Sequence, residues 1–211
     1  RQHAVVIGGG YIGLEVTASL TKLGLRVDVI EMADRLLARV ASPQISAFFA
    51  ELHQSHDVGL HIGANCREIL QKDDAFTGVQ LDDGRQIAAE LLLVGIGVLP
   101  DLDLAASAGI EAGNGILVDA MMQSSVQDIF AIGDVALIDG AALRIESVDN
   151  AQMTAARAAA AICGLAQPAI AAPWFWSEQF DVRLQSAGIV PLASPNLRHQ
   201  LRSGKREGGF S

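Results

Sequence analysis

The apolar residues near the start of the chain fall into two short runs separated by a segment of helical spacing. The runs cover residues 3–7 and 26–30, and the helical segment covers residues 14–23 and ends before Gly24. A second helical pattern spans residues 42–52, with Pro43 suited to its first turn. A strand, a helix and a second strand form a β-α-β unit, in which the two strands lie parallel.

Further apolar runs extend this unit. They predict a strand from residue 60 through Cys66 toward Leu70, a hairpin from residues 76–81 and 85–88, and a buried strand at residues 91–94. We therefore predict an α/β fold class, with a doubly wound, Rossmann-like domain over residues 1–100 that carries an inserted hairpin.

The later part of the chain has a different pattern. It predicts short strands at residues 115–119 and 128–135, an alanine-rich helix at residues 150–163, and strand-like alternation from Trp174. The second of these strands ends in Gly-Asp. A carboxylate just past a parallel strand lies at the sheet edge where ligands bind, so Asp134 is a candidate for holding ligand hydroxyl groups.

The most informative motif is the glycine turn GGGYIG at residues 8–13, between the first strand and the first helix. Gly8 allows a tight turn, and Gly10 lets the backbone approach a pyrophosphate. Gly13 lets the helix pack closely on the strand. The phosphates then meet free N–H groups at a helix N-terminus. This context predicts a dinucleotide-binding site.

An acidic residue marks the second strand of the same unit. Glu31 follows Gly13 by 18 positions, where a carboxylate accepts both ribose hydroxyls of adenosine and repels a 2′-phosphate. We therefore predict a preference for NADH. Arg35 and Arg39 leave NADPH as an alternative cofactor, because guanidinium groups near that ribose accommodate the extra charge of a 2′-phosphate.

Composition narrows the function classes. The 211 residues are half apolar and carry a net charge of −9, which argues against nucleic acid as a partner. No apolar run reaches the ~20 residues of a membrane span. Cys66 and Cys163 give neither a disulfide framework nor a metal cluster, so a cytoplasmic location is expected. We interpret His53, His56 and His61 as surface or core residues and predict no metal site.

Six segments together resemble one family. They are GGGYIGLE at 8–15, LARVASP at 37–43, LLLVGIGVLPD at 91–101, DIFAIGDVA at 128–136, RIESVDNAQ at 144–152 and PWFWSEQFD at 173–181. The chain resembles the FAD-dependent ferredoxin reductases of Rieske dioxygenases and bacterial cytochromes P450, within the pyridine nucleotide-disulfide oxidoreductase superfamily. The combination of IESVDNAQ with PWFWSEQ is specific to that group.

The resemblance implies three domains. Residues 1–100 match the NAD-binding domain, residues 101–170 the returning half of an FAD-binding domain, and residues 171–211 the start of an α+β third domain. Because the chain holds one glycine fingerprint and begins and ends at strand-like segments, we expect an internal fragment that is inactive alone.

The resemblance also implies site residues. The catalytic candidates are Glu15 and Glu146, facing the nicotinamide, and Trp176, near the flavin. Expected contacts to NAD come from Gly8, Gly10, Tyr11, Ile12, Gly13, Glu31, Arg39, Gly95 and Ile96, and contacts to FAD from Gly133, Asp134 and Val148. Two simpler interpretations remain: Glu15 as a helix-surface residue near the positive end of the helix dipole, and Trp174 or Trp176 as core residues.

The predicted function is electron transfer from NADH through FAD to a [2Fe–2S] ferredoxin. Two alternatives stay open. One is a disulfide-type or peroxide-type flavoprotein, disfavoured because the NAD domain holds only Cys66 and no Cys-x-x-Cys pair. The other is an NADH-responsive binding module resembling apoptosis-inducing factor, which the acidic charge balance does not support.

Overall fold

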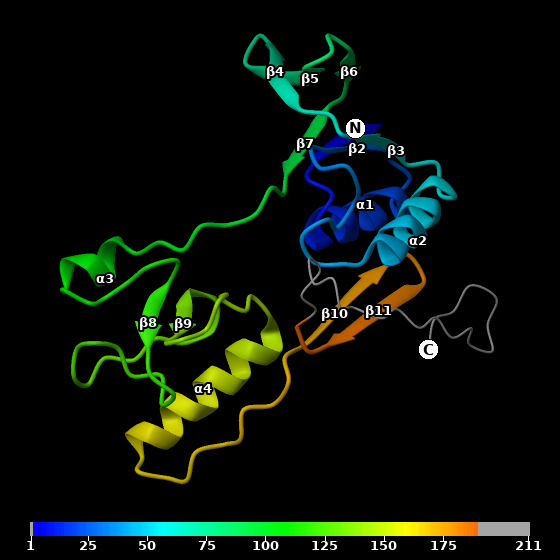
Figure 1. Cartoon of the computed structure of the whole chain (residues 1–211). Helices are drawn as coiled ribbons and strands as arrows, with labels where there is room; N and C mark the ends of the chain where they lie inside the picture. The colour runs from blue at the N-terminus through cyan, green and yellow to red at the C-terminus, as the bar shows by residue number, and fades with distance from the viewer. Residues whose placement is uncertain (1, 190–211) are drawn as a thin grey trace, which may run out of the picture.

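The computed structural model describes residues 2–189. Its centre is a parallel sheet with the strand order β3-β2-β1-β7, and two helices pack on one face of this sheet (Figure 1). The elements are β1 (His3–Ile7), α1 (Tyr11–Lys22), β2 (Arg26–Glu31), α2 (Pro43–Gln54), β3 (Gly59–Ile62) and β7 (Leu91–Val94). This arrangement confirms the α/β class and the Rossmann-like β-α-β unit.

Side-chain alternation along the strands builds two cores. Val27 and Val29 of β2 face the helices, where they pack with Leu14 and Phe49. On the opposite face Ile30 packs against a three-stranded antiparallel sheet. That sheet consists of β4 (Cys66–Lys72), β5 (Ala75–Leu81) and β6 (Gln86–Ala88). The predicted hairpin is therefore present, and it covers the second face of the parallel sheet.

One predicted strand is wrong in its extent. The apolar residues from 60 to 70 form two strands in different sheets, because the chain turns at Gly63, where φ is +70°. β3 joins the parallel sheet beside β2, and β4 begins the antiparallel sheet. Apolar periodicity continues through this turn, so it did not reveal the change of sheet.

The second part of the chain is a smaller unit. It contains α3 (Asp103–Ser107), the parallel pair β8 (Ile116–Val118) and β9 (Ala136–Ile138), the 3₁₀ turn η1 (Gly133–Val135) and helix α4 (Val148–Ile162). Figure 1 shows this unit apart from the β3-β2-β1-β7 sheet, joined to it by the segment after β7. Within that segment Val98 and Leu99 are 64% and 91% exposed.

The strand predicted at residues 128–135 is wrong. Phe130 makes only an isolated bridge with Gln123, and the Gly-Asp pair lies in η1, before β9. Positive φ angles at Asp128 and Gly133 interrupt the extended backbone. Ile132 is extended but joins no ladder within residues 2–189.

The last described element is an antiparallel hairpin of β10 (Trp174–Gln179) and β11 (Val182–Ala187). Figure 1 shows it lying against α1 and α2. Phe180 at its turn enters the core between these helices, and Lys22 donates a hydrogen bond to the Phe180 carbonyl. The rest of the predicted third domain, residues 190–211, lies outside the described residues. Among the described helices, none has the length and apolar character needed to cross a membrane.

Candidate dinucleotide and flavin sites

Three glycines form a close contact at the carboxyl ends of β1 and β7. A Cβ atom on Gly8 would lie 2.3 Å from the Gly95 carbonyl oxygen, and one on Gly13 would lie 2.0 Å from the Gly8 carbonyl oxygen. Gly8 also has a φ of +109°, which L side chains rarely adopt. Only glycine therefore allows the turn, the helix and β7 to approach this closely.

Helix α1 presents free donors at this edge. Its N-cap Gly10 has no capping side chain, and its first turn carries no acidic residue. The N–H groups of Tyr11, Ile12 and Gly13 have no partner within the helix, as in any first helical turn. A Cβ on Gly10 would meet nothing within 4 Å. The arrangement suits a pyrophosphate, because the anion would meet both the N–H groups and the positive end of the helix dipole.

Glu31 lies at the end of β2 and contacts the same turn. Its Oε2 accepts a hydrogen bond from the Gly9 N–H at 2.6 Å, and its Oε1 accepts one from the Ala33 N–H at 2.7 Å. Four lone-pair positions exist on a carboxylate, so two remain for ribose hydroxyls. β1 is the strand at which the connection order reverses, and ligands of open α/β sheets bind at such a point.

The two arginines beside this edge have different surroundings. The Arg35 guanidinium is hydrogen-bonded within the protein: it donates to the carbonyls of Ala38 and Ala41 and to Ser46 Oγ. Arg39 is exposed, and its guanidinium lies 3.3 Å from where a Cβ on Gly97 would stand. The Arg39 guanidinium thus stays exposed beside Gly97, whereas Arg35 holds the loop between β2 and α2.

Tyr11 and Ile12 differ in exposure. The Tyr11 ring packs on Phe175 of β10, with ring centroids 4.3 Å apart, and burial raises the pKa of its hydroxyl. Ile12 is 66% exposed and Ile96, after β7, is equally exposed. Ile12 and Ile96 thus expose apolar side chains close in sequence to Gly13 and Gly95, whereas the Tyr11 ring is turned toward β10.

The second cluster lies around η1 and the start of α4. The Gly133 N–H donates to Thr154 Oγ1 at 2.9 Å. Asp134 is exposed, and its carboxylate makes no hydrogen bond within residues 2–189. Arg144, which sequence reasoning did not single out, donates to the Asp134 carbonyl and pairs with Glu146 at 2.7 Å. The fold therefore brings Asp134 and Glu146 together through Arg144.

Helix α4 begins beside the same cluster. Ser147 caps it by accepting from the Asn150 N–H at 3.2 Å, and Val148, its first residue, is 55% exposed. Asp149 accepts a hydrogen bond from the Trp174 N–H at 3.2 Å, which ties the helix to β10. Unlike α1, helix α4 is capped, but Ser147 satisfies only the Asn150 N–H, so the N–H groups of Val148 and Asp149 have no partner within the helix.

Trp176 stacks on Trp174 on one face of β10, with centroids 5.0 Å apart. The alternate residues Phe175, Ser177 and Gln179 point to the other face, toward α1 and α2. Both tryptophans are half-buried, so they form a shared aromatic surface at the edge of the hairpin.

Glu15 of α1 points to the hairpin. Its Oε1 accepts from Ser177 Oγ at 2.6 Å and from the Glu178 N–H at 3.3 Å. Sequence reasoning did not single out Ser177, because a serine within an alternating strand carries no distinguishing signal. The predicted NAD contacts thus gather at the carboxyl ends of β1, β2 and β7, whereas Asp134, Glu146 and Val148 lie around η1 and the start of α4.

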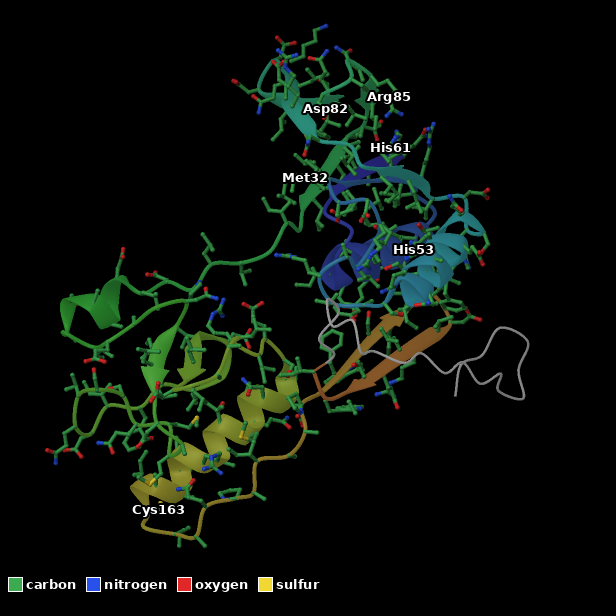
Figure 2. All side chains as sticks on the ribbon, viewed as in Figure 1. Met32, His53, His61, Asp82, Arg85 and Cys163 are labelled. Carbon is green, nitrogen blue, oxygen red and sulfur yellow. The ribbon has the colours of Figure 1, made fainter. Side chains whose placement is uncertain are left out.

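The thiols and histidines have separate positions. Cys66 and Cys163 are both free, and Figure 2 shows Cys163 at the C-terminal end of α4. His61 bonds to the Asp28 carboxylate at 2.7 Å, whereas His53 is fully buried between α2 and the hairpin. Exposed His56 stacks on Phe180.

Comparison with known proteins assigns the class. Residues 1–155 match the family described as pyridine nucleotide-disulphide oxidoreductase. The chain belongs to that family, whose cofactors are FAD and a pyridine nucleotide. The predicted cofactor pair is thereby confirmed at the level of the family.

The relatives narrow the assignment. The chain is 46% identical to the ferredoxin reductase subunit of 5,5′-dehydrodivanillate O-demethylase from Sphingobium sp., over 90% of this chain and 47% of that protein. The ferredoxin reductase for the CYP199A2 system of Rhodopseudomonas palustris is 43% identical, with a TM-score of 0.85 over 90% of this chain and 48% of that one.

A complex is also among the similar structures. The covalent putidaredoxin reductase–putidaredoxin complex is 39% identical, with a TM-score of 0.86 over 89% of this chain and 46% of that one. The chain spans about half the length of the curated relatives it matches. The predicted resemblance to ferredoxin reductases is confirmed.

Proposed function

We propose that the protein containing these residues is an NADH:ferredoxin oxidoreductase, which passes electrons from NADH through FAD to a [2Fe–2S] ferredoxin of an oxygenase or cytochrome P450 system. The observation that carries this proposal is the uncapped start of α1 beside Glu31, which offers a pyrophosphate and a ribose their complementary groups. Similarity to ferredoxin reductases supports a ferredoxin as the electron acceptor. FAD, when bound, supplies the hydride and one-electron chemistry, and the protein aligns the reactants.

We assign residues 1–100 to NAD binding, 101–170 to part of an FAD-binding domain and 171–211 to a third domain. On the nucleotide side, Gly8, Gly10, Gly13 and the backbone of Tyr11 and Ile12 hold the phosphates. Glu31 and Arg39 contact the adenosine half, and Gly95 and Ile96 line the path to the nicotinamide. The break in packing after β7 supports this division.

On the flavin side, the exposed Asp134 carboxylate and the N–H of Val148 are unpaired within the described residues. The Arg144 side chain is only 7% exposed, and its Nε also lacks a partner there. These features fit a polar ligand: Gly133 and Asp134 would hold the ribityl and phosphate part, and Val148 the edge of the ring. Glu15 and Glu146 face the nicotinamide in this proposal, and Trp176 borders the flavin.

The test uses the full-length protein loaded with FAD. NADH-dependent reduction of cytochrome c is measured with and without a [2Fe–2S] ferredoxin, beside a disulfide and a peroxide as alternative acceptors. The proposal expects rapid reduction only when ferredoxin is present. Faster turnover of the disulfide or peroxide would support the second flavoprotein type, and NADH binding without turnover would support a binding module. A cytoplasmic location belongs to the same proposal and rests on the two free thiols.

A further inference from the structure

A buried chain of hydrogen bonds connects Glu15 to α2 through the hairpin. Ser177 Oγ donates to Glu15 Oε1 at 2.6 Å, and Gln179 Nε2 donates to Ser177 Oγ at 3.1 Å. Gln179 Oε1 lies 2.9 Å from His53 Nε2. Ser177, Gln179 and His53 are all completely buried. A buried polar atom that lacks a hydrogen bond costs free energy, so each bond of this chain restricts how its neighbours are oriented.

The charge of Glu15 fixes the direction of the whole chain. An ionised carboxylate only accepts, so the single hydroxyl hydrogen of Ser177 goes to Glu15. Ser177 then has only an acceptor left for Gln179, which must present its NH₂ group. The amide oxygen of Gln179 consequently faces His53, whose Nε2 must carry the hydrogen.

The surroundings of His53 agree with one neutral tautomer. Its Nδ1 is buried without a hydrogen-bond partner among residues 2–189, so a proton there would be an unsatisfied donor. Burial is the main cause that lowers the pKa of His53, outweighing the hydrogen bond to Gln179. The Phe180 ring packs edge-on against it at 5.0 Å.

Both protein hydrogen bonds to Glu15 fall on Oε1. Oε2 therefore has no partner within the described residues and stays available to a ligand. We propose that Ser177, Gln179 and neutral His53 are positioning residues, which hold the Glu15 carboxylate in one orientation through a chain of fixed direction. The inference rests on the proposed function in one respect, the place of Glu15 on the nicotinamide side.

The role is tested in the FAD-loaded full-length protein by stopped-flow measurement of flavin reduction by NADH. Gln179→Met removes both amide bonds at similar volume. We expect this variant to reduce flavin about tenfold or more slowly, because a small misplacement of reacting groups lowers a rate by up to about 10²-fold. The NADH concentration giving half the maximal rate should change less than twofold, because the adenosine contacts lie elsewhere.

A double-mutant cycle separates positioning from stability. In a Glu15→Gln background, Gln179→Met should cause no further slowing, because the group it positions has changed. Phe180→Leu is the matched control: it loosens the same hairpin but keeps all three hydrogen bonds, and its rate should stay within twofold of wild type. The proposal would be overturned if Gln179→Met slowed flavin reduction by the same factor in the wild-type and Glu15→Gln backgrounds. It would also be overturned if Phe180→Leu slowed flavin reduction as much as Gln179→Met does. If Gln179→Met does not fold, the same cycle is measured with Ser177→Ala in its place.

A spectroscopic measurement tests the chain independently of turnover. In the ¹⁵N spectrum of histidine-labelled protein, His53 should be the neutral Nε2–H tautomer and should keep that form from pH 8 to below the ordinary histidine pKa. An Nδ1–H tautomer would contradict the assigned direction. Absence of NADH-dependent flavin reduction in the wild type, with the Nε2–H tautomer present, would instead count against the proposed function alone.

Discussion

The Glu31 carboxylate accepts a hydrogen bond from the Gly9 N–H at 2.6 Å, so the acid at the end of β2 and the glycine turn after β1 form one structural unit. We therefore expect a substitution of Glu31 to affect both ribose recognition and the conformation of the turn.

Wild-type protein should prefer NADH to NADPH by at least about tenfold, or about 1.4 kcal/mol, because the carboxylate binds ribose hydroxyls and repels a 2′-phosphate. Glu31→Gln should reduce this ratio severalfold. The dissociation constants of both nucleotides at low salt measure it. Glu51→Gln, an exposed charge change on α2, should leave the ratio unaltered. Equal affinities in the wild type would refute the assignment of Glu31.

Gly10→Ala and Gly13→Ala should behave differently. A Cβ on Gly10 meets nothing within 4 Å, so Gly10→Ala should keep the wild-type melting temperature yet weaken NADH binding, because the methyl group occupies the space of the pyrophosphate. A Cβ on Gly13 lies 2.0 Å from the Gly8 carbonyl oxygen, so Gly13→Ala should lower both stability and binding. Gly113→Ala, with no neighbour within 4 Å, is the control. Unchanged NADH affinity in Gly10→Ala would place the nucleotide elsewhere.

Asp134→Ala should reduce flavin retention in the full-length protein. The loss of a hydrogen bond to a charged group costs roughly 1.5–3 kcal/mol, so the variant should purify partly without FAD. The ratio of flavin absorbance to protein absorbance measures occupancy. Asp139→Ala changes another exposed carboxylate of the same unit and should retain full flavin. Full occupancy in Asp134→Ala would leave Asp134 as a turn residue of η1.

Trp176→Ala should slow the reduction of ferredoxin more than the reduction of FAD by NADH. The reason is that Trp176 belongs to a half-buried aromatic surface that we place beside the flavin on the path to the acceptor. Stopped-flow traces resolve the two half-reactions. Trp176→Phe keeps an aromatic ring and should be less affected. If ferredoxin reduction is unchanged in Trp176→Ala, the side chain serves packing only.

Stability should fall on acidification through His53. Burial lowers its pKa in the folded state, so the unfolded state binds the proton more readily. The loss should begin as the pH falls below the ordinary value of 6.5 and should continue down to the lower folded pKa. Denaturant unfolding at several pH values measures it. His53→Gln, which keeps an amide donor and cannot titrate, should flatten the dependence in this window.

Local patterns in the sequence determined much of the nucleotide-binding unit. The spacing of Gly8, Gly10 and Gly13 is informative because the steric contact between Gly8 and Gly13 lies within a single turn of chain. The hairpin of β5 and β6 was likewise predictable from a local turn signal at residues 82–84. In both cases the decisive interactions join residues only a few positions apart.

Tertiary structure alone decided which surfaces meet. Glu15 and Ser177 are 162 positions apart, and His53 and Gln179 are 126 apart, so no periodicity links them. The separation of β3 from β4 and the shift of Asp134 into η1 depended on positive φ angles and on the partners available to each strand. Alternation specifies which residues of a strand share a face, whereas the element packed on that face is chosen by complementarity in the folded chain.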